Sequence, residues 1–568
     1  MAVTDSTSTD SSSSDPSSTD LSNIIKAYDI RGTYPDQINE DLAHAVGVAF
    51  VKVLGISAAD GGPGAVVVGH DMRPSGPDLV ASFAEGVREM GCHVIEIGLA
   101  STDALYFASG HLALPGAMFT ASHNPAQYNG IKLCRVGAAP VGQDSGLREI
   151  TELIQSGFSA PEGPIGNISH RDLLPEYAQY LRELVPVENG RHLKVVVDSG
   201  NGMGGYTVPA VLEAAAGLPE LPLTIIPMYF ELDGTFPNHE ANPIEPANLI
   251  DLQNKVRETG ADLGLAFDGD ADRCFVVNEK GDPVTPSAIT ALIAARELQR
   301  HPGSSVIHNL ITSRTVPEVV AENGGIAVRT RVGHSFIKAT MAETNAVFGG
   351  EHSGHFYFRD FWRADSGMLA ALHCIAALGE TPVGTPFSSL MTPFDRYAAS
   401  GEINTVVADQ VAAMDHIKSV YSARTDLGPI IFDDLDGLSV DSDTWWFNVR
   451  PSNTEPLLRL NVEAKDPALM ITLRDHVLSL MKDSASTATS TATPTATATS
   501  TSSSSLAPAG IAAELWAVLA CPCPAHGALR ASAEPDRIEC TVCGLRFPIL
   551  DGIPVMLLDS AEPAPSGS

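Results

Sequence analysis

Three aspartates at alternate positions form the clearest chemical motif in the sequence. Asp268, Asp270 and Asp272 stand in the segment DGDADR, between the apolar runs LGLAF and CFVVN. Because alternate residues of an extended loop face the same side, the three carboxylates are expected to converge. Crowded carboxylates repel one another unless a hard cation neutralises them, and oxygen ligands suit Mg²⁺ or Ca²⁺ better than zinc. The motif therefore predicts a magnesium site with room for a further oxygen ligand, such as a phosphate.

A calcium-binding EF-hand loop is the alternative interpretation of the same segment. The three aspartates match the first, third and fifth positions of that loop, and Glu279 falls at the twelfth. However, Arg273 occupies the sixth position, where the sharp turn of an EF-hand requires glycine. The flanking apolar runs also have the pattern of strands rather than helices. The magnesium site is therefore favoured.

A second polar turn, TASHNP, follows the apolar run GAMF at residues 116–119. It places Ser122 just beyond a predicted strand, with His123 and Asn124 beside it. Taken alone, this turn is most simply explained by capping of the next segment, because serine and asparagine are common turn residues. It lacks the GxSxG pattern of a nucleophile elbow, so the serine does not indicate an ester hydrolase.

Two later turns carry groups that can bind a sugar and a phosphate. GGEHSGH spans residues 349–355, and RPSNTEP spans residues 450–456. The first offers side chains suited to sugar hydroxyls, and the second offers a guanidinium, hydroxyls and an amide that can cradle a phosphate dianion. These side chains are Glu351, Ser353 and His355 in the first turn, and Arg450, Ser452, Asn453 and Thr454 in the second. Taken alone, each segment is equally compatible with an ordinary surface turn.

The elements that must position these turns are predicted to be alternating strands and helices. Short apolar runs bounded by glycine recur, including AVVVGHD, LKVVVDSGNG and DLGLAFDGD. They alternate with stretches such as residues 78–90, whose apolar positions follow the helical period. This alternation indicates an α/β fold with mostly parallel sheets. Such sheets place ligand sites in the turns beyond strand ends, where the serine and aspartate motifs lie.

Length and charge restrict the class of protein further. A chain of 568 residues exceeds the roughly 250–300 residues at which one core stops growing, so several domains are expected. The net charge of −33 opposes non-specific binding to nucleic acid or to anionic membranes. The first 22 residues have no apolar stretch and no basic residue, and no apolar run approaches the ~20 residues that span a bilayer. We expect a soluble, cytoplasmic protein with a disordered N-terminus.

The C-terminal part of the chain differs in composition from the rest. Residues 484–505 consist of serine, threonine, alanine and proline, which cannot bury enough surface to fold and therefore predict a tether. Beyond it, four of the eight cysteines crowd together as Cys521, Cys523, Cys540 and Cys543. This distribution suggests a small metal-ribbon module in a reducing compartment rather than a disulfide scaffold.

Together and in this order, the segments of the body resemble the phosphohexomutase family, in particular its bacterial phosphomannomutase/phosphoglucomutase branch. KAYDIRG at residues 26–32 resembles the N-terminal substrate loop of that family, and NGIK at residues 129–132 follows the serine as expected. TASHNP resembles its phosphoserine loop, DGDADR its Mg²⁺ loop, GEHSGH its sugar loop and RPSNTEP its phosphate loop. The similarity spans about residues 22–482.

The C-terminal tail resembles a second, smaller family. The phrase FPILDGIPVML, with the cysteines before it, is similar to the small zinc-ribbon proteins that activate RNA and protein methyltransferases. The candidate zinc ligands are Cys523, His526, Cys540 and Cys543, because a zinc ribbon uses two closely spaced ligand pairs. A metal-free mini-domain with reduced thiols is the equally weighted alternative. A module of this size has a marginal core, so without metal it would need a protein partner.

These resemblances imply a fold of three related α/β domains and a smaller α+β domain around a central cleft, followed by a linker and a zinc-ribbon-like domain. The expected boundaries are a disordered N-terminus at 1–22, domain I with the phosphoserine loop at 23–165, domain II with the metal loop at 166–280, domain III with the sugar loop at 281–392, domain IV with the phosphate loop at 393–483, a disordered linker at 484–508 and the small module at 509–560.

The activity implied by the resemblance is the interconversion of hexose 1-phosphates and hexose 6-phosphates. A phosphoryl group on Ser122 would pass to the sugar, and a hexose 1,6-bisphosphate, which also serves as activator, would return its other phosphoryl group. Mg²⁺ would offset the charge of the phosphoserine. Mannose, glucose and glucosamine phosphates remain alternative substrates, and no nucleic-acid or membrane partner is expected.

The resemblance also assigns roles to individual residues. The catalytic residues that it implies are Ser122, Arg31, Lys132 and His123, and the metal ligands are Ser122, Asp268, Asp270 and Asp272. The substrate-binding residues are Tyr28, Arg273, His334, Glu351, Ser353, His355, Arg450, Ser452, Asn453 and Thr454. Arg73 is expected beside the phosphoserine loop. In residues 306–314, where a further basic residue facing the substrate is expected, the sequence offers only Arg314.

A different class of function provides the alternative hypothesis. The body would then be a catalytically inactive sugar-phosphate-binding or regulatory protein, and the C-terminal module would recruit a methyltransferase or another protein partner. The intact Ser122 and the three aspartates favour the enzyme.

Overall fold

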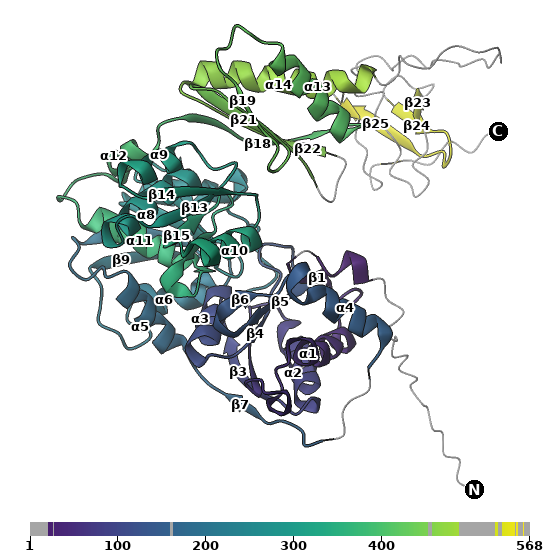
Figure 1. The fold of residues 1–568 in the computed structure, drawn as a ribbon, viewed down its shortest axis with the longest axis vertical. Helices are drawn as coiled ribbons and strands as arrows, with labels where there is room; N and C mark the ends of the chain where they lie inside the picture. Colours follow the sequence, from purple (N-terminus) through teal and green to yellow (C-terminus); the bar gives the residue numbers. More distant parts are fainter. Residues whose placement is uncertain are drawn as a thin grey trace. The chain divides into compact units, whose positions relative to one another are not determined.

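The fold was analysed in a computed structural model, which describes residues 21–26, 28–158, 163–452, 457–487, 529–531, 537–550, 553–554 and 561. The chain divides into two compact units, Met1–Thr489 and Ser490–Ser568. The described residues of the first unit contain four sheets, and those of the second contain one (Figure 1). Residues 1–20 and 488–528 lie outside the described residues, and so do most of the predicted disordered N-terminus and linker.

The first sheet belongs to the domain that carries the serine turn. Its strand order is β1-β5-β4-β2-β3-β7. Strands β7, β3, β2 and β4 are parallel to one another, whereas β5 pairs antiparallel with β4, with β1 and with the short strand β6. The strands are β1 Ile30–Thr33, β2 Ala65–His70, β3 His93–Leu99, β4 Gly116–Phe119, β5 Tyr128–Arg135, β6 Ala139–Pro140 and β7 Ile168–His170, and the helices are α1 Glu40–Leu54, α2 Gly76–Glu89, α3 Thr102–Leu112 and α4 Leu147–Ser156.

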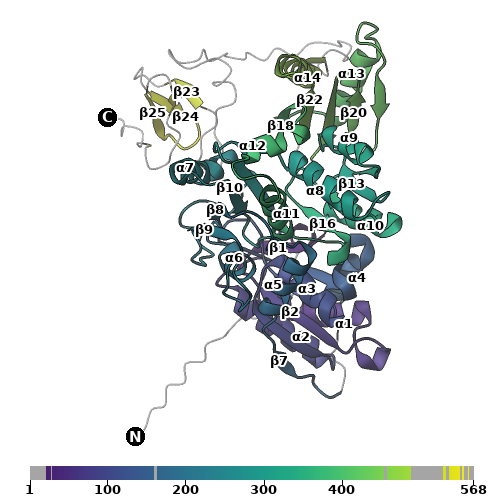
Figure 2. The same ribbon diagram turned by 90° about the vertical axis from the view of Figure 1, so that its left-hand side faces the viewer.

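Strand β2 shows why the apolar run AVVVGHD becomes a buried strand. Val66 and Val68 pack into the core formed with α1 and α2, which lie side by side in both views (Figures 1 and 2). Val67 belongs to the opposite core, together with Leu105 of α3. A strand that is covered on both faces has a continuous apolar sequence instead of an alternating one. The predicted α/β arrangement is therefore confirmed for this domain.

The second and third sheets repeat one topology, in which three parallel strands are followed by two antiparallel ones. Their strand orders are β9-β8-β10-β11-β12 and β14-β13-β15-β16-β17. The strands are β8 Leu193–Asp198, β9 Leu223–Met228, β10 Leu263–Phe267, β11 Cys274–Asn278, β12 Pro283–Val284, β13 Ser305–Asn309, β14 Ile326–Thr330, β15 Phe348–Gly350, β16 Phe356–Phe358 and β17 Ala364–Asp365. The helices are α5 Leu174–Leu184, α6 Gly204–Leu212, α7 Ile250–Thr259, α8 Pro286–Arg300, α9 Thr315–Glu322, α10 His334–Thr344, α11 Gly367–Gly379 and α12 Phe387–Met391.

This repetition places three loops at equivalent points of three domains. The β4–β5, β10–β11 and β15–β16 connections each leave the carboxyl end of a parallel strand and return antiparallel to it. They carry TASHNP, DGDADR and EHSGH, respectively. The strands that flank DGDADR exclude the EF-hand alternative, because the flanks of an EF-hand loop are helices. Sheets of this kind bind ligands beyond the carboxyl ends of their strands, so the topology itself gathers the three loops.

A buried carboxylate joins the first three domains. Asp103, in α3, is fully buried and accepts hydrogen bonds from the hydroxyls of Ser101, Tyr177 and Ser366. Tyr177 lies in α5 and Ser366 caps α11, so the three donors come from the three α/β domains. Burial raises the pKa of Asp103 to about 6, although the three hydroxyls oppose this rise.

The fourth sheet is entirely antiparallel, with the order β18-β22-β21-β20-β19. Helices α13 and α14 pack together against its apolar face (Figure 1). The elements are β18 Ala398–Val406, α13 Gln410–Ser422, β19 Ile431–Asp433, β20 Leu438–Asp441, β21 Trp445–Pro451, β22 Leu457–Ala464 and α14 Pro467–Thr487. This domain is the expected α+β domain, and α14 continues past residue 483, at which the linker was predicted to begin.

The second unit contains a small antiparallel sheet, β23-β24-β25-β26. Its strands are β23 Leu529–Ala531, β24 Arg537–Cys540, β25 Arg546–Leu550 and β26 Ile553–Pro554. Cys540 ends β24 and Cys543 lies in the turn that follows. The predicted zinc ligands Cys523 and His526 lie outside the described residues.

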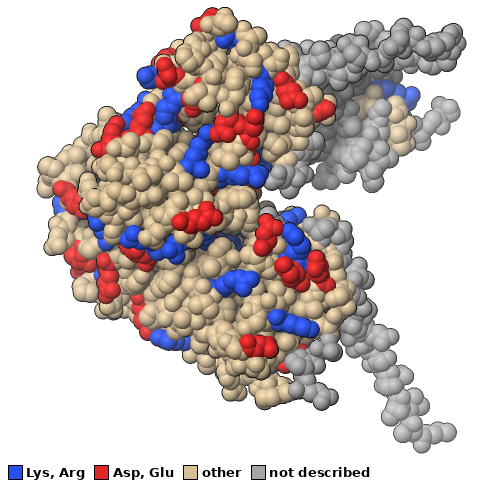
Figure 3. Space-filling model, in the orientation of Figure 1, with Lys and Arg blue, Asp and Glu red and all other residues tan. Residues whose placement is uncertain are grey.

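One helix of the described residues is long and apolar enough to cross a membrane, namely the span Glu40–Asp60 that includes α1. However, 61% of its apolar window is buried within the protein, and Phe50 of α1 packs on Phe83 of α2. Burial in the core therefore accounts for its composition. Figure 3 shows basic and acidic side chains interspersed over one face of the molecule rather than gathered in a single basic patch.

Candidate active site

Ser122 stands in a strained turn directly after β4. Its backbone has a φ of 50°, a left-handed conformation that is uncommon for residues other than glycine. The Ser122 N–H donates to Oγ1 of Thr120 over 2.8 Å, and the Ser122 side chain is almost fully buried. Strained backbone of this kind persists only where its surroundings hold it in place.

Arg73 holds this turn from behind. Its guanidinium donates to the carbonyl oxygens of Ser122 (3.0 Å), Pro125 (2.8 Å) and Tyr128 (2.8 Å), and Arg73 itself is 1% exposed. The Asp71 carboxylate, 3.3 Å from Nε of Arg73, balances its charge. Arg73 therefore lies beside the serine loop, as the sequence predicted.

The serine loop and the acidic loop meet. Oγ of Ser122 donates to Oδ2 of Asp268 over 2.7 Å, although 146 residues separate them in the sequence. One carboxylate oxygen from each of Asp268, Asp270 and Asp272 lies within 4.8 Å of the others, and all three residues are buried. Among the described residues, Oδ1 of Asp270 and Oδ1 of Asp272 are buried without a hydrogen-bond donor. Buried anionic oxygens without donors fit a cation site, so this cluster could hold a metal ion.

Lys132 lies against the acidic cluster. Its Nζ donates to Oδ2 of Asp270 (2.7 Å) and to Oδ2 of Asp272 (2.8 Å), and Thr102 also donates to Asp270. Burial opposes the charged form of Asp270, but Lys132 outweighs it and holds the pKa of Asp270 below its usual range. Burial and the neighbouring carboxylates raise the pKa of Asp268 to about 7, against the effect of Arg273. The loop thus concentrates negative charge that requires cations.

Arg273 is the second cation of this group. Its Nη2 donates to Oγ of Ser122 over 2.8 Å and to Oδ2 of Asp268 over 2.6 Å, and it contacts Nδ1 of His123. Burial, together with the charge of Arg273, lowers the pKa of His123 to about 2, so this imidazole is neutral at physiological pH. The guanidinium therefore lies where charge would develop if a group were transferred from the serine oxygen.

A cavity of about 140 Å³ opens in front of Ser122. It brings together residues of three domains, and His355 of the third domain contacts Arg273 of the second through a backbone bridge. Eight of the predicted site residues line it, namely Tyr28, Arg31, Ser122, His123, Lys132, Asp272, Arg273 and His355. Arg31 donates to Oδ1 of Asn124 over 3.0 Å, which ties the N-terminal substrate loop to the serine loop.

Six lining residues were not predicted as site residues from the sequence, and two of them, Lys338 and Asp365, are charged residues of the third domain. Asp365 lies 2.8 Å from both Nζ of Lys338 and Nδ1 of His355, and its pKa is well below the usual range because these cations outweigh burial. Burial opposes protonation of His355, but Asp272 and Asp365 raise its pKa. No local pattern in the sequence marks Asp365 as a site residue. Lys338 could have been found, because it lies one helical turn after the predicted site residue His334.

The sugar-loop residues Glu351 and Ser353 are not among the residues that line this cavity. Glu351 is buried and accepts from the Tyr357 hydroxyl (2.7 Å) and the Gly333 N–H (3.2 Å), so it orders the loop that leads into α10. Ser353 is half-buried in its loop. His334 begins α10.

The phosphate-loop residues lie on the fourth domain. Arg450, at the end of β21, is buried, donates to Oδ1 of Asn461 over 2.9 Å and contacts Glu402. Ser452 is also buried, whereas Asn453 and Thr454 lie outside the described residues. Arg450 and Ser452 are not among the residues that line the cavity in front of Ser122.

The sequence left open whether segment 306–314 contributes a basic residue to the substrate site, with Arg314 as the only candidate. The Arg314 guanidinium reaches the fourth domain, where it donates to Asp441 (2.7 Å) and to the Ser442 carbonyl (2.6 Å). Arg314 lies immediately before α9, at the N-cap position of that helix.

Comparison with known proteins agrees with this arrangement. Four family models match consecutive parts of the chain: phosphoglucomutase/phosphomannomutase domain I at residues 22–160, domain II at 175–281, domain III at 285–397 and the C-terminal domain at 402–480. The chain belongs to the phosphoglucomutase/phosphomannomutase family. As a phosphohexomutase it carries all four domains in order, and the serine, acidic and sugar loops occupy the equivalent connections of the first three.

Individual relatives support the same assignment. A phosphomannomutase of Escherichia coli is 39% identical over 472 residues, which cover 80% of this chain and 98% of the relative. Phosphohexose mutases of Xanthomonas campestris are 40% identical over 460 residues, with the same coverage. The crystal structure of a family protein from Burkholderia thailandensis matches with a TM-score of 0.71 and 31% identity over 81% of this chain and 97% of that one. These relatives are enzymes by name, so an inactive binding protein is not favoured.

Proposed function

We propose that this phosphohexomutase interconverts hexose 1-phosphates and hexose 6-phosphates through a phosphoserine at Ser122 and a hexose 1,6-bisphosphate. The observation that carries the proposal is the 2.7 Å contact between Oγ of Ser122 and the buried carboxylate of Asp268. A serine held against an acidic cation site, with Arg273 donating to the same oxygen, has the parts needed for phosphoryl transfer. Hexose phosphates are accordingly the proposed substrates, and the bisphosphate is the proposed activator.

The proposed metal is Mg²⁺, held by Asp268, Asp270 and Asp272 together with Ser122. All of these ligands offer oxygen atoms, which suit a hard cation, and two buried carboxylate oxygens lack donors among the described residues. When bound, the ion would supply positive charge that offsets the oxygens of the transferring phosphoryl group.

In the proposed transfer, the bond between phosphorus and Oγ of Ser122 breaks as a bond to the sugar hydroxyl oxygen forms in line with it. The sugar hydroxyl gives up its proton inside the cavity and the serine oxygen gains one, so no net charge is released. Arg31, Lys132 and His123 are the proposed catalytic side chains around this step, and Arg273 stabilises the serine oxygen as it leaves. The bisphosphate then turns round and returns its other phosphoryl group to the serine.

The proposed substrate contacts come from all four domains. The loop of the fourth domain holds the phosphate that is not transferred, because this phosphate must bind equivalently in both orientations of the sugar, and the sugar loop holds the sugar hydroxyls. The proposed residues are Tyr28, His334, Glu351, Ser353 and His355 for the sugar, Arg273 for either phosphate, and Arg450, Ser452, Asn453 and Thr454 for the phosphate that is not transferred. We also propose the domain boundaries given above and a cytoplasmic location.

Mass spectrometry of the purified protein tests the central claim. We expect phosphate on Ser122, and we expect Ser122→Ala to lose mutase activity with mannose 1-phosphate, glucose 1-phosphate and glucosamine 1-phosphate assayed in parallel. Ser156→Ala, at the exposed end of α4, is the matched control and should retain activity. An unphosphorylated protein whose turnover is indifferent to Ser122→Ala would overturn the proposal.

For the C-terminal module we propose a zinc ribbon in which Cys540 and Cys543 supply one ligand pair. The backbone N–H groups of Val542 and Cys543 both donate to Sγ of Cys540 over 3.4 Å, and Gly544 takes a left-handed φ of 72°. A sulfur that accepts two backbone hydrogen bonds is favoured as a thiolate, the form that binds metal. Cys523 and His526 are the proposed second pair, and a methyltransferase or similar protein is the proposed partner.

Metal analysis of the full chain tests this module separately from the mutase. We expect one zinc per chain, which the double substitution Cys540→Ser and Cys543→Ser removes without changing mutase turnover. The same double substitution at the buried thiols Cys92 and Cys134 should leave the zinc in place. A metal-free native chain would establish the alternative, a mini-domain with reduced thiols.

A further inference from the structure

The sheet of the fourth domain has two chemically different faces. Alternate residues of β21 point to opposite sides, so Trp445, Phe447 and Val449 enter the apolar core under α13 and α14. The opposite face carries Trp446 and Arg450, four residues apart on the same strand. At about 3.4 Å per residue, Arg450 lies about 14 Å from Trp446 along that strand. Whatever fixes the Trp446 end of β21 therefore also sets the position of Arg450.

Arg314, in the third domain, binds the end of the sheet that carries Trp446. Its guanidinium donates to four acceptors in and beside the turn between β20 and β21: Oδ1 of Asp441 (2.7 Å) and the carbonyls of Ser442 (2.6 Å), Asp443 (2.9 Å) and Trp445 (3.4 Å). A planar guanidinium fixes orientation as well as distance when it binds several acceptors at once. The side chain is largely buried, which protects these contacts from water and salt.

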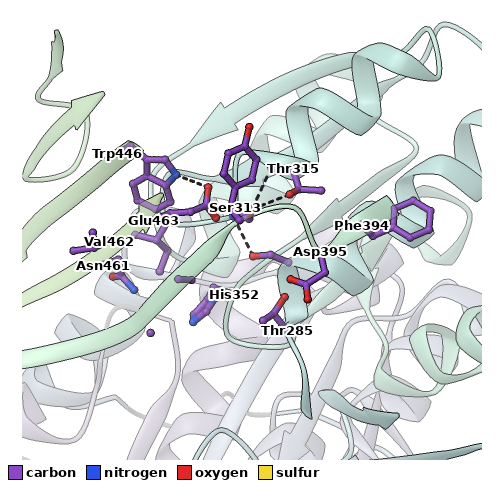
Figure 4. A pocket seen from close by; sticks show the side chains of 15 residues that line it. Thr285, Ser313, Thr315, His352, Phe394, Asp395, Trp446, Asn461, Val462 and Glu463 are labelled. Carbon is purple, nitrogen blue, oxygen red and sulfur yellow. Dashed lines mark hydrogen bonds between the residues drawn. The ribbon is translucent and has the colours of Figure 1, made fainter. Parts of the chain in front are cut away.

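The backbone of Arg314 makes a second connection through Glu463. The Arg314 N–H donates to Oε1 of Glu463 over 3.0 Å, and Nε1 of Trp446 donates to the same oxygen over 2.7 Å. Glu463 is 2% exposed, and burial raises its pKa against the effect of these donors. Figure 4 shows Trp446 and Glu463 joined in this way, with Ser313 beside them. One residue of the third domain thus holds both β21 and β22.

Little else packs between the two sheets at this point. A cavity of about 250 Å³, the one drawn in Figure 4, separates His352 and Thr285 of the third domain from Asn461 and Glu463 of the fourth. The only apolar cluster that crosses here among the described residues consists of Leu310, Ile311 and Trp446, with Val332 at its edge. Because apolar packing is sparse here, polar contacts carry much of the positional restraint: those of Arg314 at the turn before β21, and those of Arg329 and the Val332 N–H with Asp433, Ser439 and Asp436 further along the interface.

Helix α9, which directly follows Arg314, also holds the chain where it passes between the domains. Tyr397 donates to Glu318 of α9 over 2.5 Å, and Arg396 pairs with Glu318 and Glu322. The Arg314 guanidinium lies 6.0 Å from the centre of the Tyr397 ring. The Arg314 contacts and the segment that connects the two domains are therefore both anchored at α9.

We propose that Arg314 is a positioning residue of the mutase: it touches no substrate, but it fixes β21 so that Arg450 and Ser452 can bind the phosphate that is not transferred. This inference rests on the proposed role of those two residues. It also explains why the single basic residue of segment 306–314 faces away from the serine. Loss of the Arg314 contacts should weaken substrate binding and leave the chemistry at Ser122 intact.

Steady-state kinetics of Arg314→Ala in the full chain test the inference. We expect KM for the hexose 1-phosphate to rise at least tenfold while kcat changes by less than threefold, because binding made equally in the ground and transition states is lost. Arg314→Lys should have a KM between those of Arg314→Ala and the wild type, since an ammonium group cannot reach several acceptors in the fixed planar geometry of a guanidinium. Arg359→Ala, which removes a largely buried arginine paired with Asp360 in the same domain, is the matched control and should keep the wild-type KM.

Asp441→Asn keeps the test decisive if Arg314→Ala folds poorly. Asp441 is half exposed, and its substitution weakens only one of the four acceptors of Arg314, so we expect a rise in KM of two- to fivefold. A merely structural role for Arg314 would lower the folded fraction, which reduces apparent kcat and leaves KM unchanged. Wild-type KM in both variants, or a loss confined to kcat, would overturn the inference. An inactive wild-type protein would instead refute the proposed function.

Discussion

Replacing Gly269 by alanine would test whether the serine loop and the acidic loop must touch. Gly269 lies between Asp268 and Asp270, and a Cβ atom there would stand 2.3 Å from the carbonyl oxygen of Ser122. This oxygen belongs to the backbone, and Arg73 holds it from the other side. The clash therefore cannot be relieved by rotation of a flexible side chain, and the two loops must move apart.

The size of the effect follows from this distance. An ordinary contact begins at 3.4 Å instead of 2.3 Å, so the loops must separate by about 1.1 Å. A displacement of about 1 Å costs about 100-fold in rate where reacting groups have to be aligned. We therefore expect kcat of Gly269→Ala to fall about 100-fold, equivalent to about 2.7 kcal/mol of transition-state stabilisation. KM should change by less than about threefold, because the sugar and phosphate loops are not displaced.

The assay is steady-state turnover of a hexose 1-phosphate at saturating Mg²⁺. Gly163→Ala is the matched control, because a Cβ atom at that glycine meets nothing within 4 Å. Circular dichroism of both variants should match the native spectrum, so that the loss is assigned to the site and not to unfolding. Full kcat in Gly269→Ala would refute the reasoning, because contact between the two loops would then be unnecessary for catalysis.

Three further outcomes are expected. Asp270→Asn removes one of three anionic ligands and should raise the Mg²⁺ concentration needed for half-maximal activity by ~100-fold or more; an unchanged Mg²⁺ titration would contradict the metal site. Arg73→Met leaves Asp71 buried without its partner and should cost about 3–5 kcal/mol of stability, partly recovered by adding Asp71→Asn, as measured by thermal unfolding. The raised pKa of Asp103, about 6 against 3.8, means that the native carboxyl keeps its proton where the unfolded one has lost it. Stability should therefore decrease by up to ~3 kcal/mol from pH 4 to 7, and Asp103→Asn should flatten that dependence in pH-resolved melting curves.

The parts of the site that could be predicted from sequence are those fixed by local pattern. DGDADR lies between two strands because apolar runs of five residues flank it, and its aspartates converge because the loop is short. The buried strand around Val67 was predictable for the same reason. In each case, residues that are close in the chain determine the result.

The parts that could not be predicted depend on contacts between distant segments. Asp365 and Lys338 line the cavity only because the third sheet brings β17 and α10 to its edge. The direction of the Arg314 side chain depends on Asp441 of the fourth domain, which lies 127 residues further along the chain. The relation among the first three domains was implied only by the family resemblance, because TASHNP, DGDADR and EHSGH share a position in the fold without sharing a sequence.

The carboxylate of Asp103 has a consequence for biosynthesis. Its three hydroxyl partners are encoded at positions 101, 177 and 366, so a nascent chain leaving the ribosome cannot satisfy this acid until two thirds of the protein has been made. Until Ser366 has emerged, the buried Asp103 carboxylate lacks one of its three hydrogen-bond donors. Translation pauses before that point would prolong this incomplete state, and chaperone binding is expected to be strongest in that interval.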